Sequence, residues 1–234
     1  MCFVQLLHTV RTGEAAFPVQ FGRSFWDDLE ADPARAASFD AQMGSRLTAD
    51  APAVAAAYPW GDLGHVVDVG GGDASLLIAI LRAHENLRGT VVDLPGPAAR
   101  ARQAIAAAGL GLRADAVGGS FFDPLPAGAG GYVLSSVLHD WDDENAARIL
   151  RRCADAASAA GPASGKGKVI VIEEFVEDDL GRTPNTEGNL RMLCYCRGQD
   201  RTLDQLSRLA KTTDLETGPV TRGGSRWIIE MGRN

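Results

Sequence analysis

Short apolar runs alternate with helical stretches from residue 65 onward, and this alternation limits the possible folds more than any other feature. The runs expected to form strands are HVVDVGGG (65–72), TVVDLP (90–95), LRADAV (112–117), YVLSSVLH (132–139) and KVIVIEE (168–174). The stretches between them with helical spacing are ASLLIAILRAH, PAARARQAIAAAG and DENAARILRRCADAA. Buried strands that alternate with helices form parallel βαβ units. The sequence therefore predicts an α/β fold with a doubly wound, mostly parallel sheet, closed by the tail segments DLETGPV and SRWIIEMG as an antiparallel pair.

The first 58 residues have a different pattern. The stretch FWDDLEADPARAASFDAQMGSRLTADAPAVAAAY carries apolar residues at helical spacing, with a proline break after Asp32. A chain of 234 residues is long enough to bury a full core. We therefore expect a helical segment over residues 1–58, followed by the sheet domain over residues 59–234.

Charge and composition exclude several classes of protein. The net charge of −7 argues against binding to a phosphate backbone, which needs a concentrated basic surface. No apolar run approaches the roughly 20 residues of a membrane span, and the first residues lack the basic region of a signal peptide. The four cysteines show no CxxC spacing, so we expect thiols in a reducing compartment, the cytoplasm.

A glycine-rich turn, Asp68-Val69-Gly70-Gly71-Gly72, follows the first predicted strand. Glycines let the backbone approach a ligand closely, and the next helix presents free N–H groups. A nicotinamide fingerprint G-x-G-x-x-G that opens at Gly70 would need its third glycine at Ser75, so that match is incomplete. Asp68 could instead accept hydrogen bonds near the cationic amino-acid end of S-adenosylmethionine. The turn by itself leaves both cofactor classes open.

Two further features lie at the ends of the next predicted strands. Asp93 follows the glycine turn by about 20 residues, where a carboxylate can accept both hydroxyls of a ribose. That role fits either cofactor, and the alternative is a solvated loop acid. Phe121 and Phe122 follow the strand at 112–117, where an aromatic face can lie against adenine, although packing in the core explains either ring equally well.

His139-Asp140-Trp141 stands at the end of the apolar run 132–139. A histidine delivered to the crevice at the carboxyl end of a strand is placed to accept a proton, because its ordinary pKa is near 6.5. A histidine with a structural role is the alternative on this motif alone.

Several of these segments together resemble a known family. The quoted segments are VVDVGGGDASLL, VVDLP, GGSFFDPLP, LSSVLHDWDDENAARIL, KVIVIEE and RML…GQDRTLDQL. In this order they resemble the plant-type and bacterial class I O-methyltransferases that act on phenols, flavonoids, phenazines and polyketides. The resemblance covers nearly the whole chain, and LHDWDDE and GQDRT are more specific than the glycine turn. It implies a Rossmann-like class I methyltransferase fold, with residues 1–58 as a linker and substrate-pocket segment and residues 59–234 as the S-adenosylmethionine-binding catalytic domain.

The resemblance also implies roles for individual residues. His139 matches the catalytic base, and Glu173 and Asp200 match the two acids that orient it, although Asp200 is one methylene shorter than the usual Glu. Asp140 and Met192 are expected on the substrate side, with core packing as the alternative for Met192. The positions that match the cofactor site are Asp68, Gly70, Gly72, Asp93, Leu94, Ser120, Phe121 and Ser135. Ser120 stands where an Asp usually contacts the adenine region.

The expected reaction is methylation of an aromatic hydroxyl of a polyketide or another secondary metabolite. S-Adenosylmethionine is the expected cofactor and no metal is needed, because the aspartates are scattered over separate loops. The alternatives are a relative that decarboxylates or hydroxylates, a nicotinamide oxidoreductase, and a non-catalytic cofactor-binding scaffold. The resemblance also implies that full-length relatives are homodimers through a helical domain ahead of this region. The chain begins at what resembles the linker, LLHTVRTGEAAF, so we expect a monomer or a weak dimer.

Overall fold

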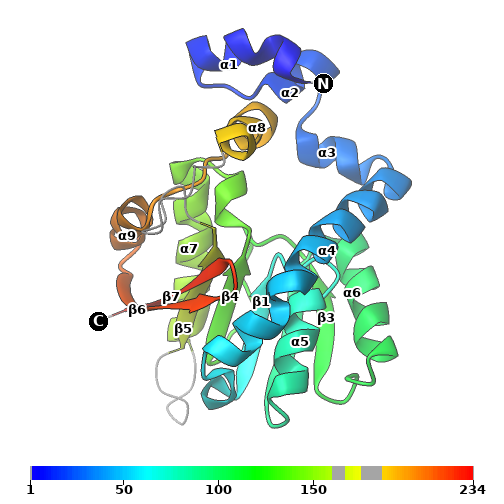
Figure 1. Cartoon of the computed structure of the whole chain (residues 1–234), viewed down its shortest axis with the longest axis vertical. Coiled ribbons are helices and arrows are strands. Elements are labelled where there is room, and N and C mark those ends of the chain that lie inside the picture. Colours follow the sequence, from blue (N-terminus) through cyan, green and yellow to red (C-terminus); the bar gives the residue numbers. More distant parts are fainter. Residues whose placement is uncertain (1, 160–166, 175–185, 234) are drawn as a thin grey trace.

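A seven-stranded sheet forms the centre of the computed structural model, which describes residues 2–159, 167–174 and 186–233 (Figure 1). The strand order is β3-β2-β1-β4-β5-β7-β6. The strands are β1 (His65–Val69), β2 (Arg88–Asp93), β3 (Ala114–Gly118), β4 (Gly131–Ser135), β5 (Lys168–Glu173), β6 (Glu216–Gly223) and β7 (Arg226–Gly232). The first five pair in parallel, and β7 pairs antiparallel with both β5 and β6. The predicted doubly wound, mostly parallel sheet and its antiparallel closing pair are confirmed.

Helices cover both faces of this sheet. One face carries α4 (Pro33–Ala57), α5 (Ser75–Ala83) and α6 (Pro95–Ala107), and the other carries α7 (Asp143–Ser158) and α9 (Leu203–Lys211). Side chains alternate between these layers along each strand: in β4, Tyr132 and Leu134 pack toward α7 and α9, whereas Val133 packs toward α5. Each fully buried aliphatic side chain of this kind stabilises the fold by about 1.5–3 kcal/mol.

Helices also make up the segment before the sheet, as the sequence predicts. They are η1 (Cys2–Gln5), α1 (Leu6–Thr12), α2 (Ala16–Phe21), α3 (Phe25–Glu30) and α4, with η2 (Trp60–Leu63) leading into β1. The break after Asp32 is a helix start: Pro33 takes the first position of α4, and Asp32 Oδ1 accepts the N–H groups of Ala34 and Arg35, both at 3.1 Å. Within the described ranges, no helix combines the length and the apolar composition that crossing a bilayer requires.

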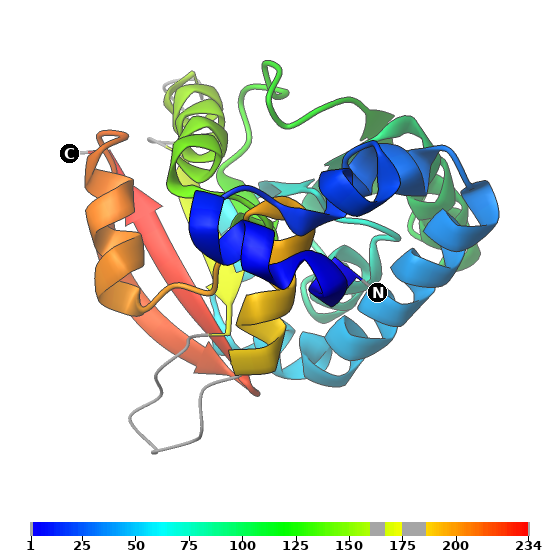
Figure 2. The same ribbon diagram turned by 90° about the horizontal axis from the view of Figure 1, so that it is seen from above.

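The first helices and α8 (Thr186–Cys196) lie together above the sheet (Figure 2). An aromatic cluster joins them, in which Phe25 stacks on Tyr195 of α8 with ring centroids 5.1 Å apart and Phe17 meets the same tyrosine edge-on at 5.8 Å. The helix α8 also contacts η3 (Leu138–Asp140) below it. This layer therefore covers the end of the sheet at which η3 lies.

The strand that leads to His139 is shorter than the sequence predicts. The run 132–139 was expected to be strand throughout, but β4 ends at Ser135, and His139 lies three residues beyond Ser136 in η3. The physical reason is the backbone of Ser136, which has a φ of 55° and turns the chain out of the sheet. Because β1 has β2 on one side and β4 on the other, the crevice of the doubly wound sheet opens between the carboxyl ends of β1 and β4.

A buried arginine ties the ends of β4 and β5 to the helical segment. Arg226, the first residue of β7, donates to the hydroxyl of Ser136 and pairs with Glu174 at 3.3 Å and with Asp50 of α4 at 3.5 Å. Asp50 also accepts the backbone N–H of Ser225 at 3.0 Å. The helix α4 is thereby fixed to the same edge of the sheet that carries the loop of His139.

Candidate active site

A histidine–glutamate pair lies at the carboxyl ends of β4 and β5. His139 Nδ1 is 2.8 Å from Glu173 Oε2, and the other oxygen of that carboxylate accepts the backbone N–H of Leu138 at 3.1 Å. Glu173 ends β5 and is only 6% exposed, so its carboxylate is held from both sides within the protein. With Nδ1 engaged in this way, Nε2 is the ring atom left to accept a proton from a ligand.

The charges around His139 favour its protonated form. Burial opposes the imidazolium, but the negative charges of Glu173, Asp140 and Asp200 outweigh it and hold the pKa of His139 well above its ordinary value. Asp140 is influenced by the same cluster: burial raises the pKa of Asp140, and the positive charge of His139 opposes that rise. The acidic surroundings therefore favour the imidazolium form of His139 in the ligand-free protein.

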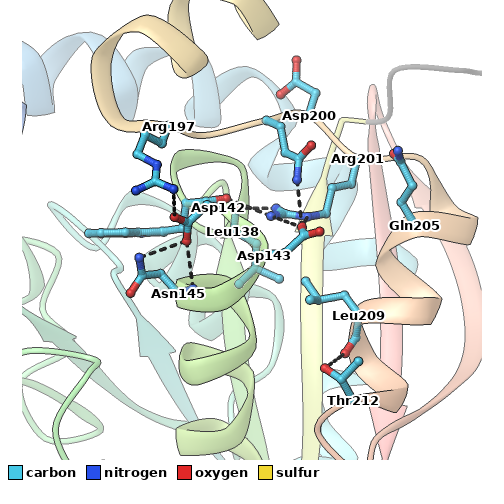
Figure 3. A network of polar contacts seen from close by, with 12 residues as sticks. Leu138, Asp142, Asp143, Asn145, Arg197, Asp200, Arg201, Gln205, Leu209 and Thr212 are labelled. Carbon is cyan, nitrogen blue, oxygen red and sulfur yellow. Dashed lines mark hydrogen bonds and ion pairs between the residues drawn. The ribbon is translucent and has the colours of Figure 1, made fainter. Parts of the chain in front are cut away.

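The second acid assigned to the imidazole is placed differently from the first. His139 Nε2 is 3.5 Å from Asp140 Oδ1, so Asp140 is the acid beside that atom. Asp200 acts on the ring through its charge, and its own backbone N–H donates to Asn189 Oδ1 at 3.0 Å. In Figure 3 the carboxylate of Asp200 points away from the contacts of Arg201. Direct pairing of Asp200 with His139 stays a prediction.

The glycine turn at the end of β1 holds an acid without a partner. Asp68 is 2% exposed, and neither of its carboxylate oxygens has a hydrogen-bond partner in the part of the chain that the structure describes. Burial, with added repulsion from Asp93 and Asp73, raises the pKa of Asp68 to about 7. The carboxylate lies directly under the turn, since a Cβ at Gly71 would be 2.6 Å from its Oδ2. A buried carboxylate of this kind needs a cation or a proton.

The rest of the turn is shaped by close approach. Gly70 has a φ of 73°, and a Cβ there would lie 2.9 Å from Val137 Cγ2, so only glycine fits. Gly72 has a φ of 57°, and its N–H donates to Asp93 Oδ2 at 2.8 Å. The other oxygen of Asp93 accepts the N–H of Leu94 at 2.7 Å. Asp93 is thus oriented toward the turn, as a ribose-binding acid at the end of β2 requires.

Aromatic rings extend from the turn to the loop of His139. Phe121 lies near the Gly70 backbone and meets Trp141 edge-on, with centroids 5.8 Å apart. Trp141 in turn stacks on Trp26 of α3 at 6.2 Å and 19°. Ser120 fixes the backbone that carries the two phenylalanines, because its hydroxyl accepts the N–H of Phe122 at 3.2 Å.

For two predicted site residues, Ser135 and Met192, the structure gives contacts that do not define a role in the site. Ser135 ends β4, and its hydroxyl is buried without a hydrogen-bond partner in the described structure, beside Asp50 and Arg226. Met192 is half-buried on α8, where its carbonyl accepts the N–H of Gly198 at 3.1 Å. That bond connects α8 to the segment leading to Asp200, while the contact of the Met192 side chain with a substrate stays a prediction.

Comparison with known proteins identifies the family. Residues 3–215 match the model of the O-methyltransferase domain. The chain belongs to the O-methyltransferase family. It is 53% identical over 98% of its length to 2,7-dihydroxy-5-methyl-1-naphthoate 7-O-methyltransferase of Streptomyces carzinostaticus, and 41% identical over 96% to aclacinomycin 10-hydroxylase RdmB of Streptomyces purpurascens. It spans 66% and 59% of the length of these two relatives, less than two thirds of each.

A solved structure agrees with this family fold. The crystal structure of the O-methyltransferase NcsB1 from neocarzinostatin biosynthesis, in complex with S-adenosylmethionine and 2-hydroxy-5-methyl naphthoic acid, matches with a TM-score of 0.91 and 50% identity. The match covers 100% of this chain and 68% of the other. The predicted Rossmann-like methyltransferase fold is thereby confirmed, and a nicotinamide oxidoreductase is no longer an alternative.

Three further residues contact this site although the sequence analysis assigned them no role. Gly44 of α4 packs on the turn, since a Cβ there would be 2.6 Å from Asp73 Oδ2. Arg201 and Gly198 contact the backbone around His139, and the GQDRT motif was the signal that pointed to them. Among the described residues, no group of three His, Cys, Asp or Glu side chains could hold a metal ion.

Proposed function

We propose that this chain is the S-adenosylmethionine-dependent catalytic part of an O-methyltransferase that methylates an aromatic hydroxyl of a small molecule. The observation that carries the proposal is the pairing of His139 with Glu173, 2.8 Å apart, at the switch point of a methyltransferase sheet. The neighbouring strand β1 carries Asp68, whose buried carboxylate has no hydrogen-bond partner among the described residues. A proton acceptor and an acid that can pair with a cation, on neighbouring strands, fit methyl transfer from a sulfonium donor to a hydroxyl group.

The residues at the end of β1 and β2 fit S-adenosylmethionine. Asp68 would take its ammonium group, which supplies the missing positive partner of this acid. Asp93 would accept the ribose hydroxyls with its carboxylate, which the N–H groups of Gly72 and Leu94 orient. Phe121 would lie against the adenine, with Ser120 at its edge. When bound, the cofactor supplies an electrophilic methyl group on a sulfonium sulfur.

In the proposed reaction His139 Nε2 takes the proton of the acceptor hydroxyl while the oxygen bonds to the methyl carbon. The bond between that carbon and sulfur breaks, and its electron pair stays on sulfur, so that charge and atoms balance. Glu173 stabilises the imidazolium through Nδ1 and fixes the ring orientation. Base catalysis contributes about 10²–10⁴-fold, and holding the two reactants in line contributes further through effective molarity.

The raised pKa of His139 determines the pH dependence of this step. The neutral ring is the proton acceptor, so the rate rises with pH through the pKa of His139 in the complex. In the ligand-free protein the acidic cluster of Glu173, Asp140 and Asp200 holds the pKa of His139 above 6.5. A sulfonium cation in the crevice repels the imidazolium and moves the pKa down toward neutrality.

A hydroxylase is the second candidate function, since RdmB at 41% identity is named as one. Family membership alone therefore does not decide between the reactions. The His139–Glu173 pair favours methyl transfer, because a general base directly assists the attack of a hydroxyl oxygen on a methyl group. A non-catalytic scaffold would have no need for the pair at all.

The acceptor that we propose is a flat aromatic molecule with a hydroxyl group, of the naphthoate or polyketide type. The support is the wall formed by Trp26, Trp141 and Phe121, together with the naphthoic acid in the NcsB1 complex. Asp140 and Met192 would face this acceptor. We infer no nucleic-acid or membrane partner.

Single-turnover methyl transfer with radiolabelled cofactor over a panel of hydroxynaphthoates and phenolic polyketides tests the proposal. We expect a labelled methyl ether from at least one phenol. Binding of S-adenosylhomocysteine without any methyl transfer over the panel contradicts the proposal, and formation of a hydroxylated product would support the second candidate.

We also propose residues 1–58 as linker and pocket wall and residues 59–234 as the catalytic domain. In support, Trp26 of the first part stacks on Trp141 of the second. The proposed location is the cytoplasm, where the buried thiol of Cys153 stays reduced. A monomer or weak dimer remains the prediction for self-association, and sedimentation velocity at several concentrations measures it.

A further inference from the structure

A buried guanidinium contacts the backbone on both sides of His139. Arg201 Nη1 donates to the carbonyl of Leu138 at 2.7 Å, and Nη2 donates to the carbonyl of Trp141 at 2.8 Å (Figure 3). These two carbonyls flank His139 and Asp140, so a single side chain spans the whole turn η3. Arg201 is only 6% exposed, and bonds of this kind to a charged donor are strong in such surroundings.

The guanidinium is itself held in place. Arg201 Nε and Nη2 both donate to Asp143 Oδ1, at 3.0 and 2.8 Å, and Gln199 Nε2 donates to the same oxygen at 2.8 Å. Asp143 lies at the first turn of α7, directly after the loop of His139. The arginine therefore connects the start of α7 to the turn that carries the base.

The backbone of the same segment packs against His139 as well. A Cβ on Gly198 would overlap the carbonyl oxygen of His139 and lie 2.8 Å from the carbonyl carbon of Asp140. Gly198 is buried, and its N–H is held by the carbonyl of Met192 on α8. Residues 198–201 thus form a surface into which the turn of His139 fits closely.

From these contacts we propose that Arg201 is a positioning residue that sets the place of the His139 imidazole by bridging the carbonyls of Leu138 and Trp141. The proposal rests on the proposed role of His139 as the base. Among the described residues, Arg201 makes no hydrogen bond or ion pair with the imidazole of His139, and its hydrogen bonds to the turn go to backbone carbonyls. A lysine cannot replace it fully, because one ammonium group lacks the planar fork that reaches two carbonyls and a carboxylate together.

This role predicts a change at His139 itself when Arg201 is altered. If the turn shifts, the 2.8 Å contact between His139 Nδ1 and Glu173 is weakened, and the ring loses the negative partner that favours its protonated form. A purely electrostatic role of Arg201 predicts the opposite, because removing a nearby positive charge favours the imidazolium. The direction of the shift therefore separates positioning from charge.

The test is a titration of the ring nitrogens of His139 by NMR in the 234-residue chain, with the resonances assigned from a His139→Gln sample. We expect Arg201→Gln to lower the titration midpoint of His139 by at least about one pH unit. The matched control is Arg208→Gln, which removes the same charge from a side chain that is 70% exposed on α9 and pairs with Asp204. It is expected to leave the midpoint unchanged.

Kinetics provide the second measurement. Single-turnover methyl transfer is expected to fall by at least about tenfold in Arg201→Gln, with the affinity for S-adenosylhomocysteine within twofold of the native value. The rate of Arg201→Lys is expected to lie between the native rate and that of Arg201→Gln. A midpoint and a rate both within the error of the native chain, or a midpoint that rises, would overturn the proposal.

Two milder variants decide the matter if Arg201→Gln does not fold. Arg201→Lys keeps the charge, and Asp143→Asn weakens the anchor of the guanidinium at a side chain that is 69% exposed. Both are expected to lower the His139 midpoint. Arg201→Lys decides between positioning and charge because it keeps the charge, whereas the loss of the anion in Asp143→Asn lowers the midpoint by itself. No shift in either contradicts the proposal. If the native chain transfers no methyl group, the proposed function fails, while the NMR titration still decides whether Arg201 positions His139.

Discussion

Asp68 at the end of β1 and Glu173 at the end of β5 are both buried carboxylates of the same crevice, but their surroundings differ. Glu173 accepts hydrogen bonds from the ring of His139 and from the backbone of Leu138. Asp68 has no hydrogen-bond partner among the described residues, and its pKa is raised to about 7. The fold supplies the partners of the acid beside His139, whereas we propose that a ligand supplies the partner of the acid in the glycine turn.

This contrast separates a carboxylate whose burial destabilises the ligand-free protein from one that the fold already stabilises. A carboxylate buried without a partner destabilises the ligand-free protein, and a cationic ligand recovers that free energy on binding. The base, in contrast, must already be oriented when the substrate arrives, so its partners belong to the fold. Substitutions around His139 are therefore expected to change turnover, whereas substitutions in the glycine turn and at Asp93 are expected to change ligand binding and stability.

The largest effect is expected from His139→Gln, which removes the proton acceptor and keeps the cofactor turn intact. Single-turnover methyl transfer at saturating cofactor is expected to fall by about 10²–10⁴-fold, with affinity for S-adenosylhomocysteine nearly unchanged. His65→Gln is the matched control, because His65 starts β1 and contacts Thr90 at 3.0 Å. A His139→Gln rate within threefold of the native rate would show that proximity alone drives the reaction.

On the cofactor side, Asp93→Ala is expected to weaken binding without unfolding the domain. Hydrogen bonds from ribose hydroxyls to a charged acceptor contribute about 1.5–3 kcal/mol each, which corresponds to about 10–150-fold in affinity per bond. Calorimetry with S-adenosylhomocysteine measures it, and Asp62→Ala on the exposed η2 turn provides the control. Unchanged affinity would mean that Asp93 does not bind the ribose.

A smaller effect is expected from Glu173→Gln, which removes the orienting charge but keeps the base. The pKa of His139 falls when its anionic partner is lost, so the rise of rate with pH moves to lower pH while the plateau drops by about tenfold. The pH profile of single-turnover transfer measures both changes. Glu174→Gln makes the same chemical change at the next residue, and an equal shift there would contradict a specific role for Glu173.

The smallest effect, and one of opposite sign, is expected in stability from Asp68→Asn. Because the pKa of Asp68 is raised from 3.8 to about 7 in the folded state, the native protein binds more protons than the unfolded chain between these values. Its stability therefore falls as pH rises through that window. Asp68→Asn is expected to raise the melting temperature at pH 7.5 by about 2–4 °C for each kcal/mol of relief, and to change it little at pH 4.

Differential scanning calorimetry of ligand-free protein at the two pH values measures this gain. Glu85→Gln, at an exposed loop acid, controls for the change in net charge. The same Asp68→Asn sample is expected to lose affinity for S-adenosylhomocysteine. A lower melting temperature at pH 7.5 would contradict the idea that Asp68 is kept without a partner for the ligand.

The sequence predicted the frame of the site well, for a physical reason. In a doubly wound sheet the carboxyl ends of the strands meet at one edge, so reading the strands is enough to bring Asp68, Asp93, His139 and Glu173 together. The run 132–139 was read as strand throughout, because the positive φ of Ser136 leaves no mark in an apolar pattern. Short apolar runs show where a strand lies better than where it ends.

Contacts between backbone and side chain could not be predicted in this way. Arg201 was visible only as part of a motif, because its partners are carbonyl groups of Leu138 and Trp141, which every residue carries. Asp140 was expected on the substrate side, and its position 3.5 Å from His139 Nε2 depends on the tight turn of η3. The need for glycine at 198 follows from packing between segments far apart in the chain.

The position of β7 between β5 and β6 has a consequence for synthesis on the ribosome. Glu173 of β5 pairs with Trp227 of β7 in the sheet. Glu173 is therefore translated well before the strand that covers this edge of β5. At roughly 5–20 residues per second the gap lasts roughly 3–10 seconds, during which the apolar edge of β5 is open to wrong pairing. The edge of β5 that carries Glu173 is thus completed only when nearly the whole chain has been translated.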